Sequence, residues 1–508
     1  MQNETVDVAI AGAGPAGLLL AIELVLGGAS VVVLERLAAP DETIKAGAVG
    51  ALAGEALERR GFGPDMDAEE RTMLEAFRAM AKSTGPAGEE MAKKIGKIGG
   101  HFAGLFLIDQ TRQREPHRRF RGIRQQPLER MLGDRVRAMG IEVRRGHELT
   151  DFHDDGQGVQ LQVRTPEGAR VLRCAYLVGC DGGRSVVRKR AGFEFPGTDP
   201  TITGHQAIVE LDHPERLLPL GWRRTPVGML AFGPVPGRIF VVQFEGPPPD
   251  RDAPITRDEV EGALRRVSGA DVRITSMSTA TRFTDNARQA TEYRRGRVLL
   301  AGDAAHVHSP FGGQGLNLGL LDAVNLGWKL AATLRGWAPA GILDTYTAER
   351  HGVAAAVLEN TRAQIALMRP DVFTTALRNV VTGLMDLDEG NRFFGDMMSG
   401  LRTRYDFGSD DPQVGTYVAN LALAQPDRET GLYSWMQEGG GLLVDATGGT
   451  ASTRSAPWSS RVRTVRVERG TSLLIRPDGC IAWTSAESNM SDLDAALARW
   501  FGEPVTPV

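Results

Sequence analysis

The chain has 508 residues, of which 42% are hydrophobic and 24% are charged, so it is long enough for two or three domains. Its 59 Lys and Arg against 63 Asp and Glu give a net charge of −4, whereas a nucleic-acid-binding chain would favour a basic balance. The composition therefore indicates a multidomain globular protein and gives no support to a nucleic-acid partner.

The N-terminal residues have the pattern of a strand, a helix and a second strand. Residues 8–11 form an apolar run bounded by Gly12, residues 15–27 carry apolar side chains at helical spacing, and residues 30–34 form another apolar run. Such a sequence of elements within about thirty residues predicts a βαβ unit, the building block of parallel sheets.

The pattern of helices and strands continues through the first third of the chain. The further predicted elements are helices over 64–96 and 128–139, strands over 141–144 and 175–179, and a hairpin formed by 159–163 and 170–172.

The second half of the chain changes character twice. Residues 200–280 contain several β-like runs separated by Pro and Gly, which predicts a second, mostly antiparallel layer. Residues 298–301 then predict a buried strand, and residues 322–334 belong to a long predicted helix. Residues 406–413 are acidic and rich in turn formers, so we expect a linker that leads to a small separate α/β domain.

A Gly-rich turn joins the first predicted strand to the first helix. Gly12 permits a tight turn, Gly14 lets the backbone approach a pyrophosphate, and Gly17 lets helix and strand pack closely. The N–H groups at the helix N-terminus then face the phosphates. Glu35 ends the second strand, where a carboxylate accepts ribose hydroxyls and disfavours a 2′-phosphate. The turn therefore predicts FAD or NAD, and not NADP, at this position.

Two further motifs favour FAD over NAD. Residues 180–188, Cys-Asp-Gly-Gly-Arg-Ser-Val-Val-Arg, follow a predicted strand. Asp303 ends another predicted strand, where its carboxylate can accept hydrogen bonds from a chain of sugar-like hydroxyls. The glycines at 312, 313 and 315 precede a helix whose N–H groups can hold the negative charge of a reduced flavin.

In this order, the three motifs resemble those of the class A flavoprotein aromatic monooxygenases, over roughly residues 5–360. Residues 302–330 and 175–181 are most similar to the bacterial hydroxylases that tailor aromatic polyketides of the angucycline and tetracycline type. The resemblance implies a discontinuous Rossmann-like FAD-binding domain over 1–190 and 285–405, with a helical extension. It also implies an inserted, mainly antiparallel β substrate domain over 191–284 and a thioredoxin-like domain over 414–508, where Cys480 stands alone without a redox partner.

The resemblance also implies a set of cofactor-binding residues. Asp303 would hold the ribityl chain, Pro310 would lie beside the isoalloxazine, and Leu316 and Asn317 would lie at its pyrimidine edge. Asp181 and its neighbours would lie near both FAD and a transient NADPH site. The full set is Gly12, Gly14, Pro15, Ala16, Gly17, Glu35, Arg36, Lys45, Gln125, Asp181, Gly182, Arg188, Gly302, Asp303, Pro310, Gly312, Gly315, Leu316 and Asn317.

Two segments depart from the family pattern. Many relatives carry an Arg-rich stretch after the residues equivalent to Glu35 and Arg36, but residues 44–50 of this chain contain only Lys45, a point charge without the planar fork of Arg. The helical segment 64–96 is longer than expected. It either covers the substrate cleft or forms a surface helical hairpin.

The implied activity is FAD- and NADPH-dependent hydroxylation of a polycyclic aromatic polyketide through a flavin C4a-hydroperoxide. Baeyer–Villiger oxygenation of a polyketide ketone is the alternative within enzymes. A non-catalytic FAD protein that sequesters an aromatic drug is the alternative of another class. We assign no catalytic base, because His306 and His308 fit packed structural histidines better. The apolar residues Trp222, Met229, Phe232 and Phe240 fit either a substrate wall or ordinary core.

Cysteine usage and hydropathy bear on the compartment. The chain has three cysteines, without the spacing of a disulfide framework or a metal site. No stretch of about 18 apolar residues suits a membrane span. We therefore expect a cytoplasmic monomer or homodimer without metal or membrane, whose partners are a polycyclic aromatic small molecule and O₂.

Overall fold

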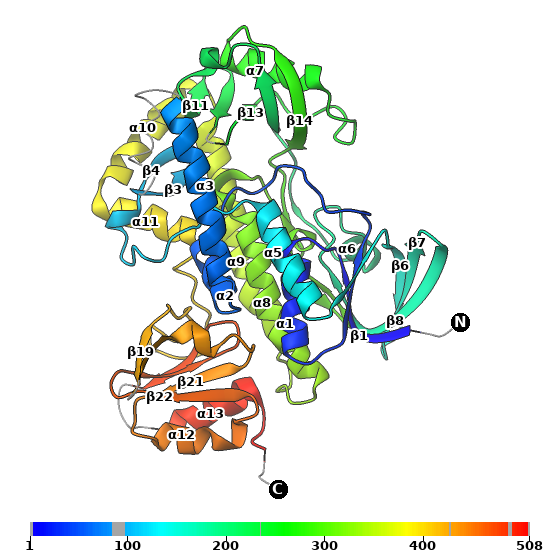
Figure 1. The fold of residues 1–508 in the computed structure, drawn as a ribbon, viewed down its shortest axis with the longest axis vertical. Helices are drawn as coiled ribbons and strands as arrows, with labels where there is room; N and C mark the ends of the chain where they lie inside the picture. The colour runs from blue at the N-terminus through cyan, green and yellow to red at the C-terminus, as the bar shows by residue number, and fades with distance from the viewer. Residues whose placement is uncertain (1–3, 84–96, 234, 426–427, 486–489, 506–508) are drawn as a thin grey trace.

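The computed structural model describes residues 4–83, 97–233, 235–425, 428–485 and 490–505. Three layers follow one another along the long axis of the molecule (Figure 1). A five-stranded sheet lies at the top, a large sheet with its helices lies in the middle, and a small domain built on a four-stranded sheet lies at the bottom. The predicted mixed α/β class is confirmed.

The large sheet has the strand order β16-β17-β8-β1-β2-β5, and β7 and β6 extend it from β8. From β17 to β5 all neighbours are parallel. Val8, Ala9 and Ile10 in β1 are fully buried because β1 lies at the centre with helices over it. The strands are β1 Glu4–Ala11, β2 Val31–Glu35, β5 Glu142–Arg145, β6 Glu148–Asp154, β7 Val159–Thr165, β8 Gly168–Gly179, β16 Arg294–Arg295 and β17 Val298–Leu300.

Long helices cover this sheet, and α1 packs directly against α8 and α5. Gly27 and Gly327 permit close approach between α1 and α8, because an added Cβ on either would lie 2.3 Å from the facing helix. The helices of this layer are α1 Pro15–Leu26, α2 Ala51–Glu58, α5 Gln125–Ala138, α6 Val186–Arg190, α8 Gly315–Leu334 and α9 Asp344–Met368.

One predicted boundary in the large sheet is wrong. We expected a separate strand over residues 175–179, but β8 runs unbroken from Gly168 to Gly179. Its first half pairs only with β7, and its second half lies between β1 and β17. The burial pattern therefore changes along a single strand from exposed to fully buried, which a sequence pattern presents as two strands.

The upper sheet is antiparallel, with the order β11-β12-β13-β10-β14, and α7 packs on its outer face. Its register aligns Trp222, Ala231, Phe240, Gln206 and Thr281 in one row across the five strands. Because side chains alternate along a strand, these five share the face opposite α7. The elements are β10 Thr203–Leu211, β11 Gly221–Thr225, β12 Gly228–Phe232, β13 Arg238–Gln243, α7 Arg257–Ser268 and β14 Ile274–Phe283.

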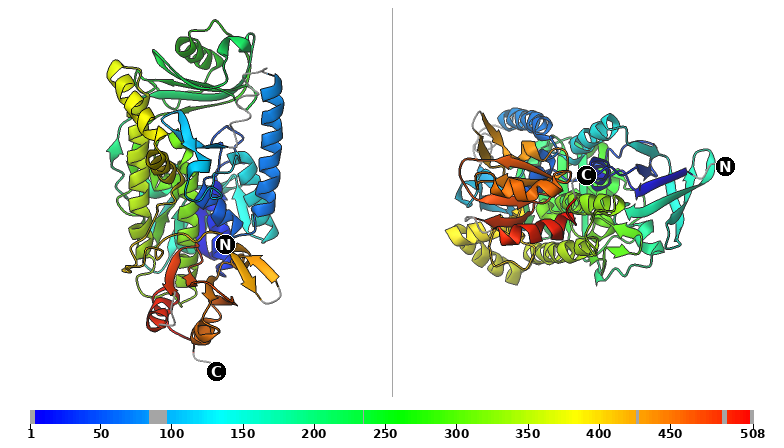
Figure 2. Two further views of the ribbon diagram at one scale, coloured as in Figure 1. Left: turned by 90° about the vertical axis from the view of Figure 1, so that its left-hand side faces the viewer. Right: turned by 90° about the horizontal axis from the view of Figure 1, so that it is seen from below.

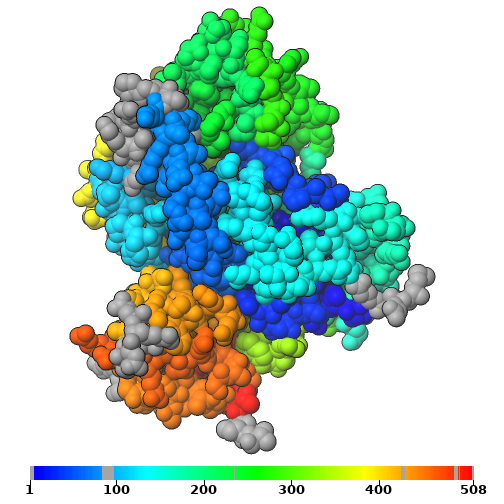
Figure 3. Space-filling view, in the orientation of Figure 1, coloured from blue at the N-terminus to red at the C-terminus, as the bar shows by residue number. Residues whose placement is uncertain are grey.

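A set of helices and a small hairpin connects the upper and middle layers. Helix α3 crosses one face of the molecule from the upper sheet past α5 (Figures 1 and 3). The β3–β4 hairpin packs on α10 and α11. The elements are α3 Gly63–Ser83, β3 Ile98–Phe102, β4 Leu105–Asp109, α10 Val372–Asp386 and α11 Asp388–Ser399, and a small sheet is formed by β9 Gly197–Thr198, β15 Ala287–Gln289 and β18 His306–Val307.

The C-terminal domain has the sheet order β22-β21-β23-β24, in which only the β21–β22 pair is parallel (Figure 2). It contains β21 Gly441–Asp445, α12 Thr450–Ser455, β22 Val462–Arg466, β23 Ser472–Ile475, β24 Ile481–Ser485 and α13 Ser491–Phe501, with the hairpin β19 Ala422–Gln425 and β20 Arg428–Gly431 beside it. No helix in the described ranges is long and apolar enough to cross a bilayer.

Buried ion pairs attach this domain to the middle layer. The turn between β23 and β24 places Arg476 against Glu349 of α9, with two nitrogen–oxygen distances of 2.8 and 2.7 Å. Lys329 of α8 contacts the same carboxylate at 2.9 Å, and Arg476 also pairs with Asp478. Burial opposes the charge on Glu349, but Arg476 and Lys329 outweigh it and hold the pKa of Glu349 far below its usual value.

A second buried network fixes the loop between β17 and α8. The Asp322 carboxylate of α8 is fully buried and accepts from Arg350 Nε at 2.7 Å, from His306 Nε2 at 2.7 Å and from the Gly302 N–H at 3.0 Å. Burial alone would raise the pKa of Asp322, but Arg350 and His306 outweigh burial and keep it below its usual value. A permanent negative charge therefore holds the loop that carries Asp303.

We predict that Asp322→Asn lowers the free energy of unfolding by about 3–5 kcal/mol, because the variant leaves the buried Arg350 without a counter-charge. Chemical denaturation at pH 7 measures the change. Since the pKa of Asp322 is depressed, its contribution is complete above about pH 4 and is lost only in more acidic solution.

The exposed pair Arg294–Asp344 provides the matched control, because its carboxylate is 75% exposed. Asp344→Asn should cost less than about 1 kcal/mol. An equal effect of the two substitutions would contradict the structural role of Asp322.

Candidate functional site

A cavity of about 2500 Å³ lies between the large sheet and the upper sheet. Its wall is formed by loops after β1, β2, β8 and β17, by the inner face of the upper sheet, and by parts of α3 and β3. Ligand pockets usually measure about 300–1000 Å³. The cavity therefore has room for a dinucleotide and a second ligand together.

The Gly-rich turn after β1 forms one end of the cavity. Gly12 has φ of 108°, and an added Cβ would lie 2.3 Å from the carbonyl oxygen of Cys180. An added Cβ on Gly17 would lie 2.1 Å from the Gly12 carbonyl oxygen, whereas one on Gly14 would meet no atom within 4 Å. Gly12 and Gly17 are thus needed for packing. Gly14 lines the cavity and leaves open space above the first N–H groups of α1.

Glu35 lies at the end of β2, as predicted, and its carboxylate is held by the adjoining backbone. The Ala13 N–H donates to Oε2 and the Leu37 N–H donates to Oε1, each at 2.9 Å. Both Glu35 and Arg36 line the cavity. A carboxylate oxygen retains further lone pairs after one hydrogen bond, so Glu35 can accept from ribose hydroxyls at this position.

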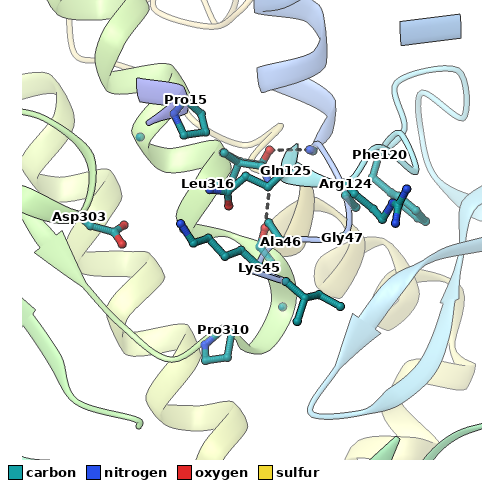
Figure 4. Close-up of a pocket in the computed structure, with 18 of the residues that line it drawn as sticks. Pro15, Lys45, Ala46, Gly47, Phe120, Arg124, Gln125, Asp303, Pro310 and Leu316 are labelled. Atoms are coloured by element: carbon teal, nitrogen blue, oxygen red, sulfur yellow. Dashed lines mark hydrogen bonds between the residues drawn. The ribbon is translucent and has the colours of Figure 1, made fainter. Parts of the chain in front are cut away.

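Asp303 points into the middle of the cavity from the loop after β17 (Figure 4). Its side chain is exposed and makes no hydrogen bond to another residue within the described ranges. Gly302 precedes it with φ of 63°, in the left-handed region, and the Gly302 N–H is held by Asp322. The carboxylate is thus carried on a fixed backbone and is free to accept hydrogen bonds from a ligand.

The N-terminus of α8 forms the next part of the wall. Gly315, Leu316 and Asn317 line the cavity at its first turn, where no side chain caps the N–H groups. Asn317 Oδ1 accepts from the Gly50 N–H at 2.6 Å, which joins the loop after β2 to this helix. Pro310 lies on the same side (Figure 4), and Gly312 lines the cavity with φ of 80°.

Lys45 and Gln125 also line the cavity. Lys45 Nζ pairs with Asp41 at 2.7 Å, so its charge is partly neutralised. Gln125 begins α5, three residues earlier than the predicted helix, and its N–H donates to the Ala46 carbonyl at 3.0 Å (Figure 4). Gln125 therefore ties the Lys45–Gly47 segment to α5.

Two predicted site residues, Gly17 and Arg188, are not among the residues that line the cavity. Arg188 is buried, lies 3.7 Å from the Phe195 ring centroid, and donates to the carbonyls of Ala304 and Gly183. Gly182 and Asp181 do line the cavity. Asp181 Oδ2 accepts from two N–H groups of α6, and its buried Oδ1 has no partner within the described ranges.

The two histidines of the third motif differ in position. His306 is fully buried and bonded to Asp322, which agrees with the packed structural histidine expected from the sequence. His308 lines the cavity, and its Nδ1 lies 2.7 Å from the Ser309 carbonyl. Burial lowers the pKa of His308, so the ring is neutral near pH 7.

The other half of the cavity is aromatic. Trp222 and Phe240 line it with ring centroids 4.8 Å apart, and Phe283 stacks on Phe240 at 4.9 Å. Of the other two apolar candidates, Met229 is buried behind this surface, and Phe232 belongs to the core under α7. These rings provide a flat surface that suits a polycyclic arene.

Sequence reasoning missed His101, which lies on β3 beside this aromatic surface. Its ring centroid is 5.2 Å from Trp222 and 4.9 Å from Phe106, and all three residues line the cavity. Burial lowers the pKa of His101 to about 4, so the imidazole is neutral at pH 7. No local motif marks this position, because its partners come from distant strands.

The described part of the long helical segment contributes to the cavity. Thr72, Met73, Ala76 and Phe77 of α3 are lining residues. Glu70 holds α3 in place through Arg119 at 2.7 Å and Arg121 at 3.0 Å. Residues 63–83 thus form part of the cavity wall, while the remainder of the predicted segment, 84–96, lies outside the described residues.

Two family models match the chain. The model described as the FAD binding domain matches residues 5–361, and the model described as the C-terminal domain of aromatic-ring hydroxylases matches residues 411–504. The chain therefore belongs to the FAD-binding monooxygenase family.

Relatives are similar along nearly the whole chain. The 12-dehydrotetracycline 5-monooxygenase/anhydrotetracycline 6-monooxygenase of Streptomyces rimosus subsp. rimosus is 40% identical, over 98% of this chain and 99% of the relative. CabE, an aromatic hydroxylase from angucycline biosynthesis, has a crystal structure with a TM-score of 0.86 and 36% identity, covering 98% of this chain and 99% of CabE. The dialkyldecalin synthase of Streptomyces rugosporus is 36% identical over 97% of this chain and 98% of the relative. The predicted resemblance to aromatic polyketide hydroxylases is confirmed.

The residues present fit FAD. The open space above Gly14 suits a pyrophosphate, Glu35 lies where a ribose is expected, and the unpaired Asp303 carboxylate lies further along the same wall. The first turn of α8 follows in line. This succession of acceptors and N–H groups matches the succession of groups in a flavin dinucleotide.

We predict that Gly14→Ala and Gly17→Ala fail for different reasons. Gly14 has φ of −74° and open space around it, so the alanine variant should keep its fold and lose FAD affinity by about tenfold or more, because the methyl group occupies the path of the pyrophosphate. Gly17→Ala should lower the melting temperature of the cofactor-free protein, because its methyl group overlaps the Gly12 carbonyl.

Fluorescence titration with FAD and thermal unfolding of both apoproteins measure the two effects. A Gly14→Ala variant that binds FAD as tightly as the parent would contradict the position assigned to the pyrophosphate.

Proposed function

We propose that the protein is an FAD- and NADPH-dependent monooxygenase that hydroxylates a polycyclic aromatic polyketide. The observation that carries the proposal is the continuity of the cavity from the Gly12–Gly17 turn to the aromatic surface of Trp222 and Phe240. Two relatives at 36–40% identity are named as oxygenases or hydroxylases of tetracycline or angucycline pathways, which supports this substrate class.

When bound, FAD would take electrons from NADPH and activate dioxygen for transfer of one oxygen atom to the ring. The chain itself positions the partners. Pro310 and the first turn of α8 would hold the isoalloxazine, and the N–H groups of that turn would stabilise negative charge on it. Trp222, Phe240 and Phe283 would orient the arene and exclude water from the reacting carbon.

The structure offers no obvious base beside the aromatic surface. His306 is occupied by Asp322, and burial keeps His101 and His308 neutral near pH 7. A neutral imidazole can accept a proton, but depressed pKa values make these rings weak bases. We therefore propose that the substrate loses its phenolic proton to water and not to a dedicated side chain.

The domain boundaries and the predicted thioredoxin-like domain belong to this proposal. The order β21, α12, β22, β23, β24, α13, with one parallel pair and a following antiparallel hairpin, supports that assignment. Cys480 is buried beside Asp478, and burial raises the pKa of its thiol well above the usual value. The domain therefore acts in structure and not in thiol chemistry.

A second candidate function has a specific observation in its favour. The dialkyldecalin synthase relative carries a name that denotes ring formation and not oxygenation, at 36% identity. The same cavity could hold FAD as a structural element beside a substrate that cyclises. Baeyer–Villiger oxygenation and drug sequestration without turnover are the remaining alternatives.

Reaction of the FAD-loaded protein with NADPH separates these functions. Mixed anaerobically with NADPH and anhydrotetracycline, the flavin absorbance should bleach, and faster than without the aromatic compound. With ¹⁸O-labelled dioxygen, the product should gain one labelled oxygen and keep its rings intact.

Each contrary result has a defined meaning. A labelled lactone would replace hydroxylation with the Baeyer–Villiger reaction. A flavin that NADPH does not reduce with any member of a panel of anthraquinone and angucycline phenols would overturn the oxygenase proposal, and a cyclised product without label would favour the synthase.

A further inference from the structure

One cation in the cavity wall has no counter-charge. Arg238 begins β13 and lines the cavity two residues before Phe240, on the same face of the strand. Its Nη2 donates to Gln206 Oε1 at 3.1 Å, while its buried Nε has no partner within the described ranges. Desolvation lowers the pKa of Arg238 to about 10, which still leaves it charged at pH 7.

The charged side chains on neighbouring elements are already neutralised. Lys45, on the loop that faces Gln206, pairs with Asp41, and Arg282 on β14 forms a bidentate pair with Glu259. Gln206 itself donates to the Lys45 carbonyl at 3.2 Å. Arg238 is thus a preorganised donor, held by a neutral amide, whose counter-charge must come from a ligand.

The position of Arg238 relative to the aromatic surface defines the ligand. Successive residues on one face of a strand are roughly 7 Å apart, about the width of two fused rings. An arene that lies on Phe240 and Trp222 therefore extends one edge to Arg238. A carboxylate side group would satisfy a single fork, but a planar edge with two adjacent oxygens matches both the guanidinium and the Gln206 amide.

We propose that Arg238, supported by Gln206, binds the substrate as an anion, through a phenolate or enolate oxygen adjacent to a ring carbonyl. This inference rests on the proposed function and specifies its substrate class: acidic hydroxyquinone or 1,3-dicarbonyl polycycles. On binding, the substrate O–H bond breaks, the electron pair stays on oxygen, and the proton leaves to solvent water. The resulting anion is the electron-rich form of the ring that an electrophilic oxygen attacks.

Alizarin, 1,2-dihydroxyanthraquinone, is the probe, because its colour reports loss of its first phenolic proton. Difference spectra of alizarin with the FAD-loaded protein across a pH series give the apparent pKa of the bound dye. We expect this pKa to fall by at least about one unit relative to free dye, as an adjacent opposite charge lowers the pKa of an acid. Binding at a pH below the free pKa is then about tenfold tighter for each unit.

Arg238→Met should abolish the shift and weaken alizarin binding about tenfold, while Arg238→Lys should retain part of it, because the charge remains without the fork. Binding of 1,2-dimethoxyanthraquinone, which has no acidic proton, should be unchanged. Arg223→Met is the matched control, because Arg223 lies on β11 of the same sheet opposite Leu230, in the core under α7, and does not line the cavity. FAD content and melting temperature verify that each variant is folded.

An unchanged pKa of bound alizarin in Arg238→Met would overturn the inference, as would an equal loss of dimethoxyanthraquinone binding. A loss of FAD affinity with alizarin unaffected would assign Arg238 to the cofactor instead. None of these readouts requires turnover. A protein that binds alizarin as an anion but inserts no oxygen would refute the proposed function and leave this inference intact, and the converse result would do the opposite.

Discussion

The buried carboxylate of Asp322 is the interaction on which the cofactor half of the cavity depends. It joins the backbone of the β17–α8 loop, through the Gly302 N–H and His306, to Arg350 on the next long helix. A loop that presents Asp303 and a left-handed glycine to a ligand has few local contacts of its own. A fixed charge behind it provides the rigidity that a binding site needs, because preformed sites lose less entropy when a ligand binds.

The same helices carry this order to the C-terminal domain. Arg350 also donates to the Tyr405 hydroxyl at 3.0 Å, and Tyr405 shares a hydrogen bond of 2.8 Å with Tyr417. One helical turn away from Asp322, Asn325 and Lys329 contact Glu349, which Arg476 of the C-terminal domain also binds. Breaking such pairs is costly since it leaves unpaired buried charges. The C-terminal domain thus has a structural reason to be retained although its cysteine is inert.

Local sequence patterns were sufficient for the first half of the site. The β1–α1–β2 unit, the Gly12–Gly17 turn and Glu35 lie within 35 residues, and their roles follow from backbone geometry and spacing. The segment 175–179 misled us because burial, and not strand identity, changes within β8. Patterns of this kind report the environment of a residue, and only tertiary contacts tell whether one strand passes through two environments.

The second half of the site could not be predicted for a related reason. Alternation along β13 shows that Arg238 and Phe240 share a face, but not that this face looks into a cavity. His101 gains its place from packing against Trp222, more than a hundred residues away in the chain, and the partner of Asp322 comes from α9. Arg188 illustrates the converse: its motif is recognisable, yet its guanidinium is used to hold the backbone of Ala304 and Gly183.

The account's central claim is that one cavity holds the flavin and the aromatic substrate side by side. A crystal structure of the protein with FAD and alizarin tests it most directly. The account predicts the isoalloxazine against Pro310 and the first turn of α8, and the anthraquinone on Trp222 and Phe240 with its oxygens toward Arg238. An arene bound outside this cavity, or a flavin whose ring lies away from α8, would contradict it.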